Sequence, residues 1–131
     1  MVAPRLSLAS AENLRVDYNS DFRHDLEVGQ LSEKFLADLL ENSTIEVKRD
    51  FLAGKTGNVF VEFESRGKPS GIATSTADYW AFVLDDDRVV MLPRGLLKVM
   101  AREAFEAGRL ATGGDSNTSR GVLVRVRELV E

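Results

Sequence analysis

Two strands are predicted within Thr44–Glu64, the stretch TIEVKRDFLAGKTGNVFVEFE. Apolar residues alternate with charged residues over positions 45–50, and a second alternation runs over positions 59–64. A period of two is the pattern of half-buried strands. Successive side chains of a strand point to opposite faces, so each strand gathers its charged side chains on one face.

Five charged side chains of these two strands recur at a spacing of two. The first strand is expected to carry Glu46, Lys48 and Asp50 on one face. The second is expected to carry Glu62 and Glu64 on one face. Like charges placed opposite each other in a hairpin reduce stability unless a cation lies between them, so the patch is a candidate metal site. The alternative is a solvated sheet face, where a pair of opposite charges contributes only about 0.2–1 kcal/mol.

The register of this hairpin depends on its connection, and the sequence leaves two connections open. A two-residue turn at residues 56–57, with glycine at positive φ, would set Asp50 opposite Glu62. Lys48 would then face Glu64 across the pair. Directly opposite residues have Cβ atoms roughly 5 Å apart, which is close enough for two carboxylates to share one divalent cation.

A longer loop over residues 51–57 is the second connection. It would set Asp50 opposite Asn58 and Glu46 opposite Glu62. The carboxylates stay near one another in both registers, so the candidate site does not depend on which connection forms.

The composition limits the chemistry that such a site can use. The chain has 131 residues, of which 44% are apolar, with no cysteine and a single histidine, His24. This composition argues against thiolate ligands, a histidine zinc site and a Ser-His-Asp triad. Carboxylates remain as the ligands of any metal ion, and oxygen ligands suit Mg²⁺, Mn²⁺ or Ca²⁺.

The length predicts one domain, residues 26–131, after an N-terminal arm, residues 1–25. No run approaches the roughly 18 apolar residues of a membrane span, so we expect a cytoplasmic protein without membrane contact. Periodicity and punctuation predict further elements: a helix over 30–41, strands over 79–84 and 88–92, a helix over 94–107, a loop over 111–121 and a strand over 122–126.

Cationic side chains lie near the charged strands even though the net charge of the chain is −4. The loop over residues 65–71 carries Arg66 and Lys68 with two glycines, a composition that suits a phosphate group as well as an ordinary turn. Arg120 lies in the later loop, and Arg49 lies on the first strand beside its charged face. We predict these four side chains as contacts of a DNA backbone.

The order of these elements resembles the core of the PD-(D/E)XK nuclease superfamily, which includes many restriction enzymes and Holliday-junction resolvases. The pattern of that family is a helix glutamate, a strand aspartate, and an acidic residue followed at the second position by lysine on the next strand. Here Glu33, within GQLSEKFLADLL, is similar to the helix glutamate, and Asp50 is similar to the strand aspartate. Glu62 and Glu64 resemble the final pair, with Glu64 at the position of the usual lysine.

Lys48 would then supply the missing ammonium group from the other strand. In a second alignment Glu46, Val47 and Lys48 themselves match the acidic-x-lysine pattern, without a preceding strand aspartate. Glu46 is therefore a supporting candidate. The segments IEVKRD, TGNVFVEFES, RGKPSGI and ADYW also resemble small endonuclease-like proteins of bacteriophages.

This resemblance implies an α/β fold with a restriction-endonuclease-like core, a central mixed β-sheet flanked by helices. It implies a homodimeric endonuclease that uses Mg²⁺ or Mn²⁺ to cut DNA, including branched DNA, in the host cytoplasm if the chain is phage-encoded. Asp50 and Glu62 would hold the ion, with Glu33 and Glu64 completing its ligation. Lys48 would orient the attacking water. Two alternatives are a nuclease-like DNA-binding or structural subunit without catalysis, and an interaction module whose charges are solvated.

Overall fold

The computed structural model describes residues 18–131 of a chain that divides into two compact units, residues 1–43 and residues 44–131. The predicted N-terminal arm lies outside the described residues except for residues 18–25. Those residues belong to α2 (Tyr18–Asn42), a helix of the first unit that begins well before its predicted start at residue 30. None of the described helices is long and apolar enough to cross a membrane.

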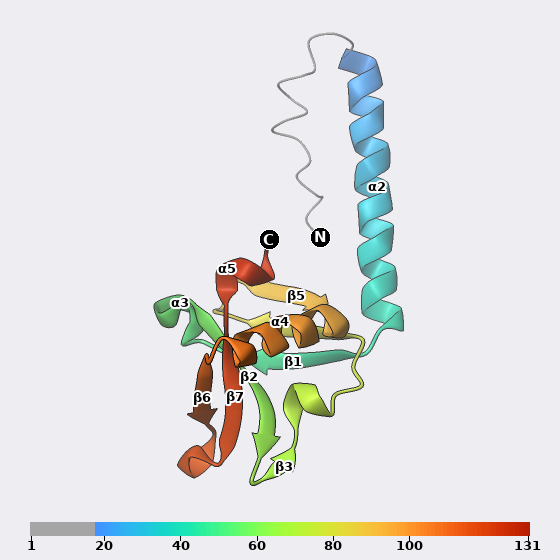
Figure 1. The fold of residues 1–131 in the computed structure, drawn as a ribbon. Coiled ribbons are helices and arrows are strands. Elements are labelled where there is room, and N and C mark those ends of the chain that lie inside the picture. The colour runs from blue at the N-terminus through green and yellow to red at the C-terminus, as the bar shows by residue number, and fades with distance from the viewer. Residues whose placement is uncertain (1–17) are drawn as a thin grey trace. The chain divides into compact units, whose positions relative to one another are not determined.

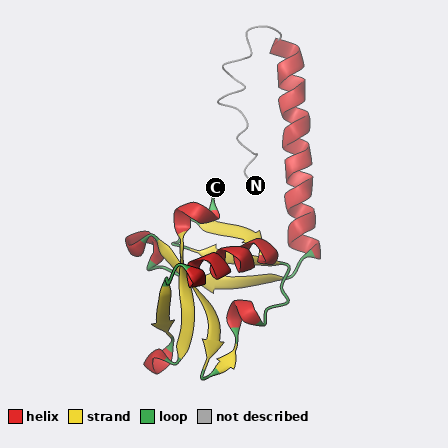
Figure 2. Ribbon diagram, in the orientation of Figure 1, coloured by secondary structure: helices red, strands yellow, loops and turns green. Residues whose placement is uncertain are grey.

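The second unit has an α/β fold, coloured by secondary structure in Figure 2. Its strands are β1 (Ile45–Arg49), β2 (Asn58–Ser65), β3 (Lys68–Pro69), β4 (Tyr79–Val83), β5 (Val89–Pro93), β6 (Leu110–Gly113) and β7 (Ser119–Arg125). Its helices are α3 (Ala53–Thr56), α4 (Arg94–Glu106) and α5 (Val126–Leu129), with 3₁₀ turns η1 (Gly71–Ala73) and η2 (Asp115–Asn117).

These strands form two sheets, where the sequence predicted one central sheet. The first is a mixed sheet with the order β1-β4-β5, in which β1 is parallel to β4 and β4 is antiparallel to β5. The second is an antiparallel sheet with the order β3-β2-β7-β6. Helix α4 packs against strands of both sheets, as can be followed in Figure 1.

The predicted hairpin between the first two strands is wrong. Residues 53–56 form the helical turn α3, and Gly57 closes it with a φ of 75° and an N–H that donates to the Ala53 carbonyl at 2.8 Å. A left-handed φ suits glycine because it has no Cβ. Since α3 separates the two strands, β1 pairs with β4 and β2 pairs with β7.

The predicted loop over residues 111–121 is wrong as well. Strands β6 and β7 occupy most of it and pair in an antiparallel ladder. Its small residues are needed for close packing: a Cβ placed on Gly121 would lie 2.6 Å from the Val61 carbonyl oxygen. The glycine therefore marks a tight approach within the sheet, where the sequence suggested a flexible connection.

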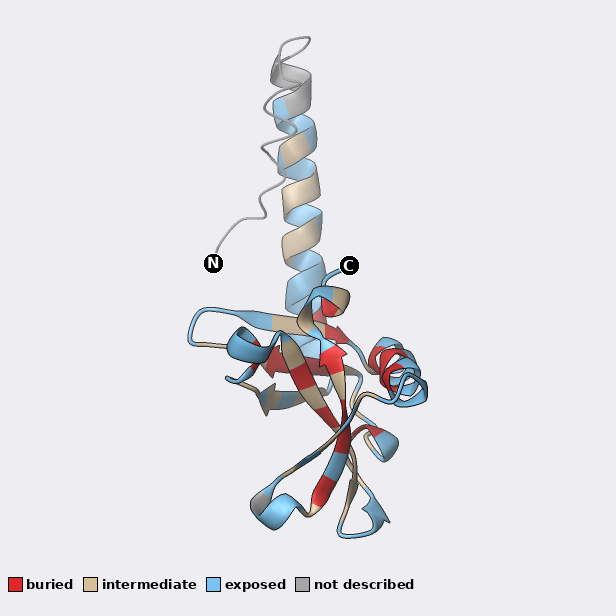
Figure 3. Ribbon diagram, turned by 60° about the vertical axis from the view of Figure 1, so that its left-hand side comes forward, coloured by how far each residue is buried: buried red, intermediate tan, exposed pale blue. Residues whose placement is uncertain are grey.

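The core of the second unit lies where the two sheets meet α4. Its largest fully buried side chains are Trp80, Phe82, Leu97, Val59, Val61, Val122 and Val124. Figure 3 shows buried residues along the inner strands and on α4. The predicted strands over 79–84 and 88–92 and the predicted helix over 94–107 are confirmed, with small shifts of their ends.

Candidate functional site

The charged face of β1 is the face that its sheet turns toward the core. In the parallel register Glu46 pairs with Trp80 and Lys48 pairs with Phe82, so these side chains share one face. Trp80 and Phe82 are 1% and 0% exposed, whereas Val47, on the other face of β1, is 60% exposed. Charged side chains rarely occupy the core side of a strand unless they have a partner or a function, which makes this face the candidate site.

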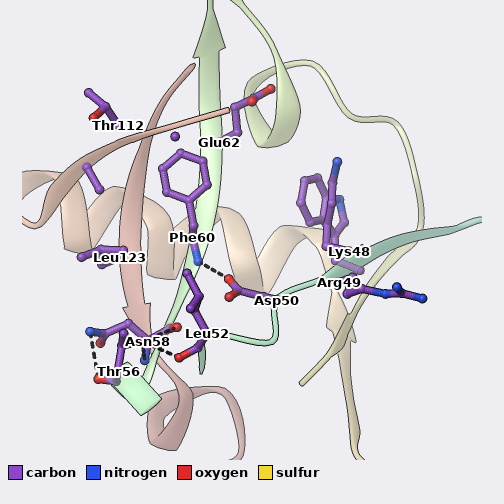
Figure 4. A pocket seen from close by; sticks show the side chains of 13 residues that line it. Lys48, Arg49, Asp50, Leu52, Thr56, Asn58, Phe60, Glu62, Thr112 and Leu123 are labelled. Atoms are coloured by element: carbon purple, nitrogen blue, oxygen red, sulfur yellow. Dashed lines mark hydrogen bonds between the residues drawn. The ribbon is translucent and has the colours of Figure 1, made fainter. Parts of the chain in front are cut away.

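Asp50 follows β1 directly and connects the two sheets. Its backbone N–H donates to the Val83 carbonyl at 2.9 Å, which extends the pairing with β4. Its Oδ2 accepts the backbone N–H of Phe60 on β2 at 2.8 Å, a bond drawn in Figure 4. At Phe60 this edge of β2 is not paired with a strand in the described residues, so the carboxylate satisfies an otherwise open donor.

A cavity of about 520 Å³ lies between the end of β1 and the face of β2 that carries Phe60 and Glu62 (Figure 4). Its polar lining residues are Lys48, Arg49, Asp50, Thr56, Asn58, Glu62 and Thr112. Its apolar lining residues are Leu52, Phe60, Trp80, Ala111, Gly113 and Leu123. A concave site of this size, with apolar walls and a few placed polar groups, is typical of ligand binding.

Lys48 brings an ammonium group into this cavity. Its Nζ lies 5.7 Å from the centroid of the Trp80 ring, a cation–π distance. Within residues 18–131 no carboxylate forms an ion pair with Lys48, although Asp50 and Glu62 line the same cavity. The positive charge therefore remains available to an anionic ligand.

Glu62 is held from the side of η1. Ser70 Oγ donates a hydrogen bond of 2.8 Å to Glu62 Oε2. Gly71 approaches β2 so closely that a Cβ on it would lie 2.2 Å from the Glu62 carbonyl oxygen. Figure 4 shows the Glu62 side chain extending away from Asp50 along β2. The two carboxylates thus share a cavity without converging on one point in this conformation.

The predicted common face of Glu62 and Glu64 is wrong because β2 has a bulge between them. Glu62 pairs with Gly121, and Glu64 pairs with the adjacent Arg120, which leaves Phe63 as the extra residue. An extra residue reverses the alternation of the strand beyond it. Glu64 Oε2 lies 3.3 Å from Arg120 Nη1, and Glu64 does not line the cavity.

Three other predicted residues lie apart from the cavity or at its margin. Glu33 lies on α2 in the first unit, so its role as a metal ligand stays a prediction. Glu46 shares the face of Lys48 but lines a separate hollow beside residues 74–77. Arg49 is among the lining residues, and its guanidinium carbon lies 5.1 Å from the centroid of the Phe51 ring.

The remaining predicted DNA contacts gather at one end of the antiparallel sheet. Arg66 and Gly67, with φ of 52° and 79°, form a two-residue turn between β2 and β3, and Lys68 follows on β3. The Arg66 N–H donates to the Thr118 carbonyl at 2.9 Å, which sets this turn beside the loop that precedes β7. Arg120 lies on β7 near the same end.

Phe60 is a lining residue that the sequence analysis did not single out. It occupies the same face of β2 as Glu62, where the alternation predicts a polar residue. A Cβ on Gly121 would lie 2.7 Å from carbons of its ring, and one on Gly113 would lie 3.1 Å from it. The sequence did contain one signal for Phe60 as a site residue: it is an aromatic residue at a position of β2 where the alternation predicts a polar one.

The donor chemistry of the cavity bears on metal binding. Asp50 and Glu62 are the carboxylates that line it, and the described residues contain no group of three histidine, cysteine or acidic side chains arranged to hold a metal. Mg²⁺ commonly binds through one or two carboxylates and completes its shell with water and substrate phosphates. The residues fit an ion shared with a bound phosphate, and they do not fit a cage made by protein alone.

Comparisons of the chain with models of protein families, with curated proteins and with solved structures found no match. A function for this chain therefore rests on the geometry of the cavity and on the residue types that line it.

Proposed function

We propose that the chain is a metal-dependent endonuclease that hydrolyses DNA phosphodiester bonds and has a restriction-endonuclease-like core of the PD-(D/E)XK type. The observation that carries the proposal is the presence of Lys48, Asp50 and Glu62 in one cavity, although they come from two strands that do not pair with each other. One lysine and two carboxylates are the residue types that the resemblance requires.

Asp50 and Glu62 are the proposed ligands of Mg²⁺ or Mn²⁺, which when bound polarises a scissile phosphate and lowers the pKa of a water ligand. Glu62 must turn from Ser70 toward Asp50 to take this role. The turn gives up one hydrogen bond to a charged acceptor, worth about 1.5–3 kcal/mol, which charge-assisted ligation offsets. Lys48, which has no ion pair among the residues that the structure describes, would bind a phosphate oxygen and stabilise the negative charge that develops there.

Cations away from the cavity would position the DNA backbone. Arg66 and Lys68 lie on the exposed turn between β2 and β3, where a duplex or single strand can approach them. Arg49, by contrast, lines the cavity itself. A cytoplasmic location and action as a homodimer, which lets two strands be cut, belong to the same proposal and rest on the resemblance.

A second candidate is a nuclease-like DNA-binding or structural subunit that has lost catalysis. Glu64 favours it, because this residue stands at the position of the usual lysine and is paired with Arg120 away from the cavity. In this candidate Lys48, Asp50 and Glu62 would bind DNA or a structural cation without hydrolysis.

Incubation of the purified chain with supercoiled, linear and branched DNA distinguishes the two candidates. The nuclease predicts strand cleavage in Mg²⁺ or Mn²⁺ and none in EDTA, with no cleavage by Glu62→Gln. The variant Glu64→Gln is the matched control, since it removes a carboxylate from the same strand on the other face, and it should cut like the parent. Failure of the parent to cut any of these substrates, together with retained DNA binding, would favour the non-catalytic subunit.

A further inference from the structure

We propose that the cavity binds one unpaired nucleobase stacked on Phe60, so that the substrate is DNA with single-stranded or flipped-out nucleotides. The inference rests on the proposed function for its ligand class and deepens it by naming the substrate. Three observations carry it: the packing of the Phe60 ring against two glycines, the residue types that line the cavity, and the charge of Lys48, which has no ion pair in the described residues.

The outer end of the Phe60 ring, its Cζ and Cε atoms, lies close to two glycines on neighbouring strands. Ring carbons approach within 2.7 Å of the place where Gly121 on β7 would carry a Cβ, and within 3.1 Å of that place on Gly113 of β6. A side chain at either position would displace the ring. The backbone at these two glycines thus limits where the outer end of the ring can lie, while Phe60 is half-buried and lines the cavity. A ring fixed in this way offers a surface for offset stacking of another flat π system.

The rest of the cavity suits the edge and the faces of a base. Leu52 and Leu123 supply apolar wall, and Asn58 and Thr112 supply amide and hydroxyl groups that can bond to a base edge. The volume of about 520 Å³ lies within the range of sites for small organic ligands. A base inside a duplex is stacked on both faces, so only an unpaired or extruded base can enter.

The ammonium group of Lys48 favours a nucleotide over a neutral aromatic ligand. The formal charges of its lining residues, Lys48 and Arg49 against Asp50 and Glu62, sum to zero, so a phosphate meets no net repulsion. Asp50 already accepts the Phe60 N–H, and Glu62 already accepts from Ser70. Lys48 has no such partner within residues 18–131, and it would meet the phosphate attached to the inserted base.

Binding of a short, dye-labelled oligothymidylate in EDTA tests this proposal without requiring cleavage. A second oligonucleotide of the same length and charge, with abasic sites in place of the bases, measures the contribution of the phosphates alone. We expect the parent chain to bind the base-containing strand about tenfold more tightly than the abasic one, the scale of one base stacked on an aromatic ring. Trp80, the one tryptophan of the sequence, lines the cavity beside Lys48, and its fluorescence should change more with the base-containing strand than with the abasic strand, whose phosphates can still reach Lys48.

The variant Phe60→Leu keeps an apolar side chain over the glycines and removes the ring, so the preference for bases should fall to about twofold or less. Phe105→Leu is the control, because Phe105 lies on α4 against Phe63 and outside the cavity. It should keep the full preference. Equal binding of both oligonucleotides by the parent, no binding of either, or an unchanged preference in Phe60→Leu would each overturn the proposal. If the parent chain cuts DNA but binds both oligonucleotides equally, this inference is wrong and the proposed nuclease stands. If the parent chain prefers the base-containing oligonucleotide but cuts no DNA, the proposed nuclease is wrong and the base-binding site stands.

Discussion

The carboxylate of Asp50 joins two strands by a hydrogen bond to the backbone and also lines the proposed catalytic cavity. Its Oδ2 accepts the Phe60 N–H at 2.8 Å, which ties the end of β1 to the open edge of β2. Substitution can separate the hydrogen bond from the charge. The amide oxygen of asparagine still accepts a hydrogen bond but has no negative charge, whereas alanine provides neither.

We therefore expect Asp50→Asn to lose cleavage while its free energy of unfolding stays close to that of the parent. Asp50→Ala should lose cleavage and also about 1–2 kcal/mol of stability, since the Phe60 N–H is left without its partner. Urea unfolding and a cleavage assay in Mg²⁺ measure the two effects. Full activity of Asp50→Asn would remove Asp50 from the site, and parental stability of Asp50→Ala would show that the hydrogen bond contributes nothing.

Gly71 provides a second test at the scale of one residue. It has a φ of 54°, and a Cβ on it would lie 2.2 Å from the Glu62 carbonyl oxygen. Gly71→Ala should lower the free energy of unfolding by roughly 2 kcal/mol or more, because strain and overlap add. Gly54→Ala is the control: Gly54 lies in α3 with nothing within 4 Å of the added Cβ, and the change should be neutral or slightly stabilising. Equal effects of both substitutions in a urea titration would contradict the close approach.

At the scale of elements, the start of β1 is fastened to the start of β4 by Thr44 and Asp78. Asp78 Oδ2 accepts the Thr44 backbone N–H at 2.9 Å and the Thr44 hydroxyl at 3.2 Å. In return Thr44 Oγ1 accepts the Asp78 N–H at 2.9 Å. The hydrogen bond from the Thr44 backbone lowers the pKa of Asp78 most, and the bond from the Thr44 hydroxyl adds to it. Together with the charge of Arg94 they hold this pKa below its ordinary 3.8.

A lowered folded-state pKa gives this clamp a defined dependence on pH. Its stabilising effect is complete above the ordinary pKa of about 4 and is lost as the pH falls through the lowered folded-state value. Asp78→Asn has no carboxyl group to titrate here. The free energy of unfolding of the parent should therefore fall more steeply than that of Asp78→Asn between about pH 5 and pH 2. If the free energies of unfolding of the two proteins fall in parallel with pH, the hydrogen bonds between Thr44 and Asp78 are not the source of the acid sensitivity.

Local sequence patterns predicted the elements with strong periodicity and missed how they pair. The apolar run YWAFVL was predicted as a buried strand, and β4, which covers YWAFV, confirms it. Its pairing with β1 was not predicted, because parallel partners are distant in sequence and the alternation of β1 does not tell which face turns to the core. The helical turn α3 was missed because four residues are too few for a periodic signal.

Prediction of the candidate site met the same limit. Lys48, Asp50 and Glu62 were all named from the sequence, and all three line the cavity. Glu64 was placed on the wrong face, because one extra residue at a bulge reverses every side chain beyond it and the sequence VEFES gives no sign of it. Phe60, the aromatic residue of the site, was missed because its position depends on packing against glycines of β6 and β7, which lie far from it in the sequence.

For the molecule as a whole, the distribution of cations predicts how DNA binding responds to salt. Lys68 is exposed on β3 and has no ion pair in the described part of the chain, whereas Arg120 is paired with Glu64. Lys68→Ala should weaken DNA binding and reduce the slope of log K against log salt by about 1. Arg120→Ala should also weaken binding, since it leaves Glu64 facing the phosphates.

The double variant Arg120→Ala/Glu64→Gln separates these two effects. If Arg120 acts by neutralising Glu64, the double variant should regain most of the DNA affinity that Arg120→Ala loses. Glu64→Gln combined with Lys68→Ala should not regain the DNA affinity that Lys68→Ala loses. Fluorescence anisotropy over a series of salt concentrations measures both slopes. Unchanged binding curves for Lys68→Ala and Arg120→Ala would show that this end of the sheet does not contact DNA.

The thermal stability of the whole chain reports whether the cavity holds a divalent cation. A ligand that binds only the folded state raises stability by about 2.7 kcal/mol at a hundredfold excess over its Kd, which corresponds to roughly 5 °C or more in Tm for a domain of this size. Because the cavity fits an ion shared with a bound phosphate, the melting of the parent, of Glu62→Gln and of Glu64→Gln is compared in EDTA and in millimolar Mn²⁺, each with the same excess of a cleavage-resistant phosphorothioate oligonucleotide. We predict a rise in Tm with Mn²⁺ for the parent and for Glu64→Gln, and a much smaller rise for Glu62→Gln. A Tm that does not change with Mn²⁺ in any of the three proteins would leave Asp50 and Glu62 without a metal and would contradict the proposed nuclease.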